Sequence, residues 1–100
     1  MNRAIKYTQR SLQDLLAGVA WYEEKRRGLG FEFLNSIEQA LSRIRDCPDL
    51  YRIIQSPIRR CLIRRFPFSI YFSDESNEIV IHAVFDNRMN PSKITSLMGE

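Results

Sequence analysis

The spacing of apolar residues changes period part-way along the chain, and this change limits the possible fold more than any other feature. Over residues 11–46, apolar residues recur every three or four positions, which is the period of an amphipathic helix. From Ile58 onwards, the chain is rich in Ile, Val, Phe and Tyr, the composition of β-strands. The 100 residues therefore predict a single α+β domain: an antiparallel β-sheet with an N-terminal two-helix hairpin packed on one face.

Two helices are expected in the first half. The first begins near Ser11, with Thr8 or Ser11 as its N-cap, and ends at the sequence KRRG, whose basic residues suit the C-terminal dipole and whose glycine, Gly28, can adopt a left-handed conformation. The second spans residues 30–46, and Pro48 stops it. Few residues separate them, so they should form an antiparallel pair. The expected apolar stripe of the first helix is Leu12, Leu15, Leu16, Val19 and Tyr22.

Trp21 falls on the side of the first helix opposite Leu12 and Val19. The favoured interpretation is that this helix touches both the sheet and its partner helix, so that Trp21 is covered. The alternative is an aromatic side chain that binds a partner protein.

Strands are expected at residues 58–65, 68–73 and 78–85, with the sequence SDESN as the turn between the last two, and a short strand at residues 4–7. The last two strands do not alternate cleanly between apolar and polar residues. A sheet with helices on one side only should alternate sharply, so its second face is expected to be covered as well. Residues 88–100 are too few to cover much of it, which favours a partner.

Positive charge is concentrated in one segment. Between Leu50 and Ser73 there are five arginines and no acidic residue, whereas the whole chain has a net charge of +3. Such a localised basic patch suits a polyanion or an acidic protein segment, and a solvated face is the alternative. The arginines of this segment are Arg52, Arg59, Arg60, Arg64 and Arg65.

Strand alternation divides four of these arginines into two pairs. Arg60 and Arg64 should share a face with Leu62, while Arg59 and Arg65 should share the other face. The pair that faces away from the helices is the better candidate for contact with a target, because arginines on the helix side can only reach the rim.

Other chemistry is scarce. His82 is the only histidine, and a middle strand should hold it about 10 Å from Cys61, too far for a nucleophile–base pair. Cys47 and Cys61 are read as reduced thiols. There is no metal-ligand cluster and no glycine-rich phosphate loop, so neither a cofactor, nor a metal, nor a small-molecule substrate is expected, and no catalytic residue is assigned. Arginines alone could still assist RNA cleavage by a 2′-hydroxyl group.

No signal peptide and no membrane-spanning stretch is recognisable in the sequence. A cytoplasmic protein without a membrane partner is therefore expected.

Several segments taken together resemble the RelE/ParE toxin superfamily, which includes plasmid stabilisation proteins. In order along the chain, between Asp14 and Pro91, they are DLLAGVAWYEE, GLGFEFLNSIEQALSRI, CPDLYR, IRRCLIRRFPFSIYF and EIVIHAVFDNRMNP. The resemblance implies the toxin of a type II toxin–antitoxin system, a growth inhibitor neutralised by a cognate antitoxin. It implies an antitoxin that covers apolar sheet surface near the basic strand.

The resemblance implies one of two activities. RelE-like members are ribosome-dependent mRNA endonucleases, whereas ParE-like members poison DNA gyrase without a catalytic site. This chain has no tyrosine after Tyr71, and Asp86 and Asn87 stand where many RelE-like relatives carry a histidine. These departures favour the ParE-like activity; the endonuclease, or a non-toxic homologue that only binds antitoxin, is the alternative. By position, the target-binding candidates are Arg59, Arg60, Arg64, Arg65 and Arg88.

Overall fold

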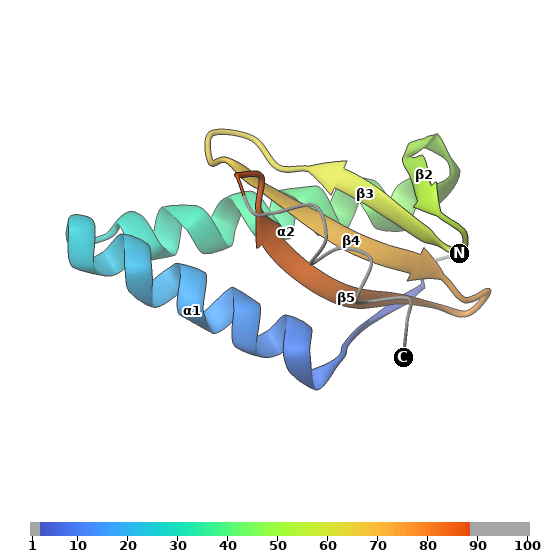
Figure 1. The fold of residues 1–100 in the computed structure, drawn as a ribbon, viewed down its shortest axis with the longest axis horizontal. Coiled ribbons are helices and arrows are strands. Elements are labelled where there is room, and N and C mark those ends of the chain that lie inside the picture. Colours follow the sequence, from blue (N-terminus) through green and yellow to red (C-terminus); the bar gives the residue numbers. More distant parts are fainter. Residues whose placement is uncertain (1–2, 89–100) are drawn as a thin grey trace.

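A computed structural model describes residues 3–88 of the chain, which form two helices packed on a five-stranded sheet (Figure 1). The elements in order are β1 (Ala4–Tyr7), α1 (Gln9–Lys25), α2 (Leu29–Asp46), the short 3₁₀ helix η1 (Pro48–Leu50), β2 (Arg52–Gln55), β3 (Ile58–Leu62), β4 (Phe68–Asp74) and β5 (Glu78–Asp86). The predicted α+β fold is confirmed.

The strand order across the sheet is β1-β5-β4-β3-β2. Strands β2 to β5 form an antiparallel meander, but β1 pairs with β5 in parallel, so the sheet is mixed and not wholly antiparallel. The sequence also gave no indication of β2. Both differences arise from short strands at the edges of the sheet, which long-range pairing defines and local composition does not.

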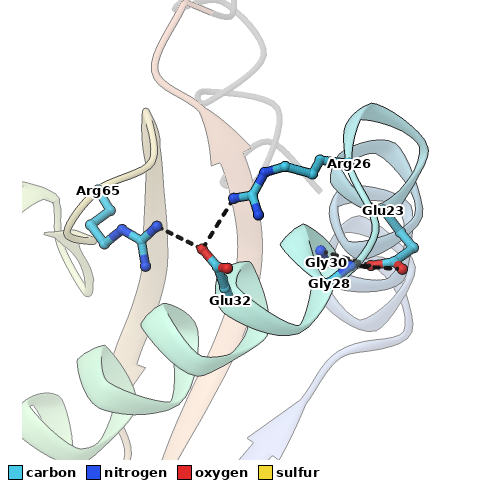
Figure 2. Close-up of polar contacts among 6 residues, drawn as sticks. All are labelled: Glu23, Arg26, Gly28, Gly30, Glu32 and Arg65. Carbon is cyan, nitrogen blue, oxygen red and sulfur yellow. Dashed lines mark hydrogen bonds and ion pairs between the residues drawn. The ribbon is translucent and has the colours of Figure 1, made fainter.

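The two helices approach each other closely because glycines stand at their contact. A Cβ atom at Gly30 would lie 2.6 Å from the carbonyl oxygen of Val19, and one at Gly18 would lie 2.7 Å from the ring of Phe33. The connection is tight as well. Gly28 has the left-handed conformation that the sequence predicted (φ 89°), and the Glu23 carboxylate accepts hydrogen bonds from the amides of Gly28 and Gly30 (Figure 2).

This close contact narrows the buried side of α1. Ser11, Leu15 and Gly18 are its buried residues, and Thr8 is the N-cap, accepting a hydrogen bond from the Ser11 amide. Leu12 and Leu16 were expected in the core, but they are exposed, Leu16 by 60%. The expected stripe was too wide, because the buried line of α1 runs through Ser11, Leu15 and Gly18 and does not form a broad apolar face.

The main core lies between α2 and the sheet. Phe33, Ile37 and Ile44 of α2 are almost fully buried. Their partners on the sheet include Cys61, Ile70, Phe72, Ile79 and Ile81. At one end of this core, the rings of Tyr22, Phe33, Phe66 and Phe68 form a cluster with centroids 4.8–6.0 Å apart. Aromatic pairs at such separations stabilise a core beyond the area that they bury.

The second face of the sheet has its own small apolar cluster. Ile58, Tyr71, Ala83 and Phe85 are buried there, with Ile54 packed against them. These side chains are buried in the chain without a partner, so the centre of this face offers little apolar surface to one. Coverage of the rest of the face by a partner stays a prediction. Residues 88–100 were expected to cover little of this second face. Apart from Arg88, these residues lie outside those that the structure describes.

We expect Gly30→Ala to lower the free energy of unfolding by about 1–3 kcal/mol, because the added methyl group must push apart the backbones of α1 and α2. Urea denaturation of the purified protein measures this loss. Gly28→Asn is the matched control, since a Cβ atom there meets nothing within 4 Å and asparagine tolerates the left-handed conformation. Equal stability of the two variants would contradict the close packing of the helices.

Candidate functional site

Arg59 faces the helices and stabilises the fold. In the register of β3 and β4 it lies opposite Phe72, a residue of the main core. Its guanidinium group donates hydrogen bonds to the carbonyl oxygens of Tyr51, at 2.8 Å, and Asp49, at 3.4 Å. Arg59 therefore fixes the segment that leads from η1 into β2, and its charge is directed at backbone carbonyls of its own chain.

Arg65 attaches the loop between β3 and β4 to the start of α2. Its guanidinium group lies 2.7 Å from the carboxylate of Glu32, which Arg26 also approaches, at 3.5 Å (Figure 2). The hydrogen bond from Arg65 is the main reason why the pKa of Glu32 lies below its usual value, with Arg26 contributing less. Arg65 itself has a positive φ of 74°, an unfavourable conformation for a residue with a Cβ atom.

Arg60 faces away from the helices, together with Arg52. Arg60 lies opposite Tyr71 on one side, a residue of the second-face cluster, and opposite Arg52 on the other. Two like charges thus stand directly across a strand pair. Arg64 comes after the end of β3, so strand alternation no longer fixes its direction, but it is exposed. Among residues 3–88, none of these three arginines takes part in an ion pair.

Arg88 lies at the other side of the sheet, just after β5. Its side chain donates to both carboxylate oxygens of Asp86, and this contact holds the pKa of Asp86 below its ordinary value. The five candidate arginines are therefore not brought together. They divide between the two faces of the sheet and its two ends, and three of them are engaged by groups of the same chain.

An apolar groove that the sequence analysis did not identify runs between α1 and β5. It has a volume of about 330 Å³. Its lining residues are Asp14, Ala17, Gly18, Trp21, Phe68, Val84, Asp86 and Arg88. The signal in the sequence was the placement of two small residues, Ala17 and Gly18, one turn before Trp21, since small side chains beside a large aromatic one leave a hollow on a helix.

Trp21 is 54% exposed, so the expectation that it would be covered is wrong. It lies on the flank of α1 away from α2, where it lines the groove, and the ammonium group of Lys25 lies 4.0 Å from the centre of its ring. A large exposed aromatic residue beside an apolar hollow is typical of a protein-binding site.

Asp14 connects the groove to the edge of the sheet. β1 pairs with β5 only as far as Ile81, and beyond it the Asp14 carboxylate accepts a hydrogen bond from the amide of Val84 at 3.1 Å. Burial raises the pKa of Asp14, although the Val84 amide and Arg10 act in the opposite direction. Helix α1 thus covers a part of the β5 edge that no strand pairs with, and this position creates the groove.

His82 and Cys61 do not form a catalytic pair, as predicted, because β4 separates their strands. The ring of His82 lies 2.8 Å from the hydroxyl oxygen of Ser73, which also donates to Glu75. Burial is the main influence on the pKa of His82 and lowers it. Ser73 is completely buried, so a substrate could not reach its hydroxyl group. Cys61 is buried on the helix side, and burial raises the pKa of its thiol.

Within residues 3–88, no three His, Cys, Asp or Glu side chains are grouped so as to hold a metal ion. In the same part of the chain, neither helix is both long and apolar enough to span a membrane.

Residues 5–91 match the family described as the ParE toxin of the type II toxin–antitoxin system, parDE. The chain belongs to this family. The structure also resembles that of a chain from the chromosomal ParDE toxin–antitoxin system of P. aeruginosa, with a TM-score of 0.73 and 18% identity over 84% of this chain and 95% of the other. No curated protein matches the sequence.

Membership of the ParE family confirms the toxin expected from the resemblance to the superfamily. The protein is the toxin of a type II toxin–antitoxin system, and toxins of this family pair with an antitoxin. At 18% identity, the structural match supports the ParE fold alone.

The stability of this ParE-family toxin should fall at acidic pH partly through Glu32. A carboxylate with a lowered pKa stabilises the fold at every pH above its pKa in the unfolded chain, and this stabilisation disappears as the pH falls through its lower folded value. Glu32→Gln should therefore be less stable than the parent at neutral pH, and the difference should shrink from about pH 5 downwards. Urea denaturation across this pH range measures it. Glu38→Gln, which removes the same charge from an exposed position on the same helix, controls for charge alone.

Proposed function

We propose that this toxin poisons DNA gyrase by stoichiometric binding and does not cleave RNA. The observation that supports this reading is the separation of its arginines. Arg59 is directed to backbone carbonyls, Arg65 to Glu32 and Arg88 to Asp86. Cleavage of a phosphodiester requires cations at one phosphate together with groups that transfer protons. Arg52 and Arg60 are neighbours, but His82, the only histidine of the chain, lies two strands away on β5 and contacts Ser73. A binding function needs no such combination of groups.

In the same proposal, the antitoxin inserts an apolar segment into the groove between α1 and β5. Toxins of this family pair with an antitoxin, and the groove offers apolar walls from Ala17, Val84 and Phe68 with Trp21 at its margin. Two carboxylates, Asp14 and Asp86, and one guanidinium group, that of Arg88, also line it, and Arg88 is paired with Asp86. The remaining negative charge of Asp14 favours a basic side chain next to the apolar anchor. In this proposal the toxin, the antitoxin and gyrase are all in the cytoplasm.

The purified toxin should inhibit DNA supercoiling by gyrase in proportion to the amount of toxin bound, and the antitoxin should abolish this inhibition. Mapping of transcript ends after induction, carried out in parallel, should show no new cleavage sites. New cleavage sites on translated mRNA, with gyrase unaffected, would establish the RelE-like alternative. Neither effect, combined with tight binding of the antitoxin, would identify a homologue that has lost its toxicity.

Trp21→Ala should weaken binding of the antitoxin by about 2 kcal/mol or more, roughly thirtyfold in Kd, because aromatic anchors in apolar hollows dominate such interfaces. Titration calorimetry with the cognate antitoxin measures the change. Phe31→Ala is the matched control, since Phe31 is also exposed but does not line the groove. An equal effect of both substitutions, or none of either, would contradict the assignment of the groove.

A further inference from the structure

Arg52 and Arg60 form an unusual feature of the second face of the sheet. They are direct partners in the register of β2 and β3, so their side chains leave the same face a few ångströms apart. Like charges in this arrangement destabilise a strand pair. Within residues 3–88 no carboxylate forms an ion pair with either arginine, and the sequence from Leu50 to Ser73 contains no acidic residue.

We propose that this face of β2 and β3 binds the phosphate backbone of double-stranded DNA through Arg52 and Arg60. The inference rests on the proposal that the target is gyrase, an enzyme that holds DNA while it acts. The inference adds that, in the complex of gyrase and DNA, this surface of the toxin contacts the DNA. We call this surface, defined by Arg52 and Arg60, the basic face.

The chemistry of the basic face suits phosphates. Duplex DNA carries one negative charge per about 1.7 Å of its axis, a density that can neutralise two adjacent guanidinium groups at once. A guanidinium group also binds phosphate oxygens through two parallel hydrogen bonds. The arginines that serve the fold, Arg59 and Arg65, are already bonded within the chain. Arg52 and Arg60, which have no ion pair within residues 3–88, can exchange their counterions for phosphate.

An acidic protein segment is the competing ligand for the basic face. Leu62, next to Arg60 on the same strand face, is 57% exposed and would favour such a segment. The other apolar neighbours on this face, Ile58 and Tyr71, are buried and offer no contact. Adjacent cations without an ion pair in the described part of the chain, on a face with little accessible apolar surface, favour the nucleic acid, whose backbone is bound mainly through charge.

The basic face is separate from the groove assigned to the antitoxin. The groove lies along β5, whereas β2 and β3 lie at the other edge of the sheet, with β4 between (Figure 1). Substitutions on the basic face should therefore leave the groove intact. Circular dichroism and urea denaturation of each variant show that it is folded.

The experiment measures binding of the purified toxin to a short labelled DNA duplex of mixed sequence by fluorescence anisotropy over a series of salt concentrations. Wild-type binding should weaken steeply with salt. Arg52→Gln and Arg60→Gln should each weaken binding and reduce the slope of log K against log salt by about 0.9, the contribution of one phosphate contact. Arg27→Gln, which removes the same charge from an exposed position at the end of α1, should leave the slope unchanged.

Three results would overturn the inference. The first is a wild-type toxin that does not bind the duplex. The second is an Arg52→Gln or Arg60→Gln variant with the same slope as Arg27→Gln. The third is competition by polyglutamate as effective as that by unlabelled DNA, together with a larger loss from Leu62→Ser than from either arginine variant, which would assign the face to an acidic protein segment.

The gyrase assay separates this inference from the proposed function. A toxin that binds DNA through the basic face but does not inhibit gyrase would refute the proposed function and leave the binding site in place. A toxin that inhibits gyrase equally well with and without Arg52 and Arg60, and whose salt slope is unaffected by their loss, would refute the inference alone.

Discussion

The close contact of α1 and α2 at Gly18 and Gly30 is the constraint from which the other features of the structure follow. It lets the Phe33 ring approach the backbone of α1 and join Tyr22, Phe66 and Phe68 in one aromatic cluster. The contact leaves α1 with a narrow buried side, so Trp21 on its flank remains uncovered. The same helix covers the edge of β5 through Asp14, and the groove between them is the result.

The position of each arginine along the backbone determines its role. Neighbouring positions on β3 point to opposite faces, so Arg59 reaches the carbonyls beside η1 while Arg60 faces outward. In the loop between β3 and β4, Arg65 forms an ion pair with Glu32, which also pairs with Arg26 (Figure 2). Charge that looks uniform in the sequence is therefore divided into arginines that stabilise the fold and arginines that remain available to a ligand.

The sequence predicted those features that depend on local periodicity and missed those that depend on long-range pairing. Both helices, the left-handed Gly28 and the three long strands followed from spacing and composition. Strand β2 and the parallel pairing of β1 did not, because each is short and is stabilised only by a neighbour distant in the chain. Without β2, Arg52 could not be placed opposite Arg60, and it was left out of the candidates. Trp21 was misplaced because its environment depends on how closely two glycines let the helices meet.

The two proposed surfaces lie at opposite edges of one small sheet, and this separation limits how an antitoxin can act. A segment confined to the groove along β5 would leave Arg52 and Arg60 exposed to DNA. Neutralisation would then depend on blocking the approach of gyrase as a whole, since an interface of ordinary size extends well beyond a pair of arginines. Alternatively, the antitoxin continues past the groove and places acidic residues over the basic face. If the antitoxin is confined to the groove, the toxin–antitoxin complex keeps the salt-dependent contribution of Arg52 and Arg60 to DNA binding. If the antitoxin extends over the basic face, the complex loses this contribution.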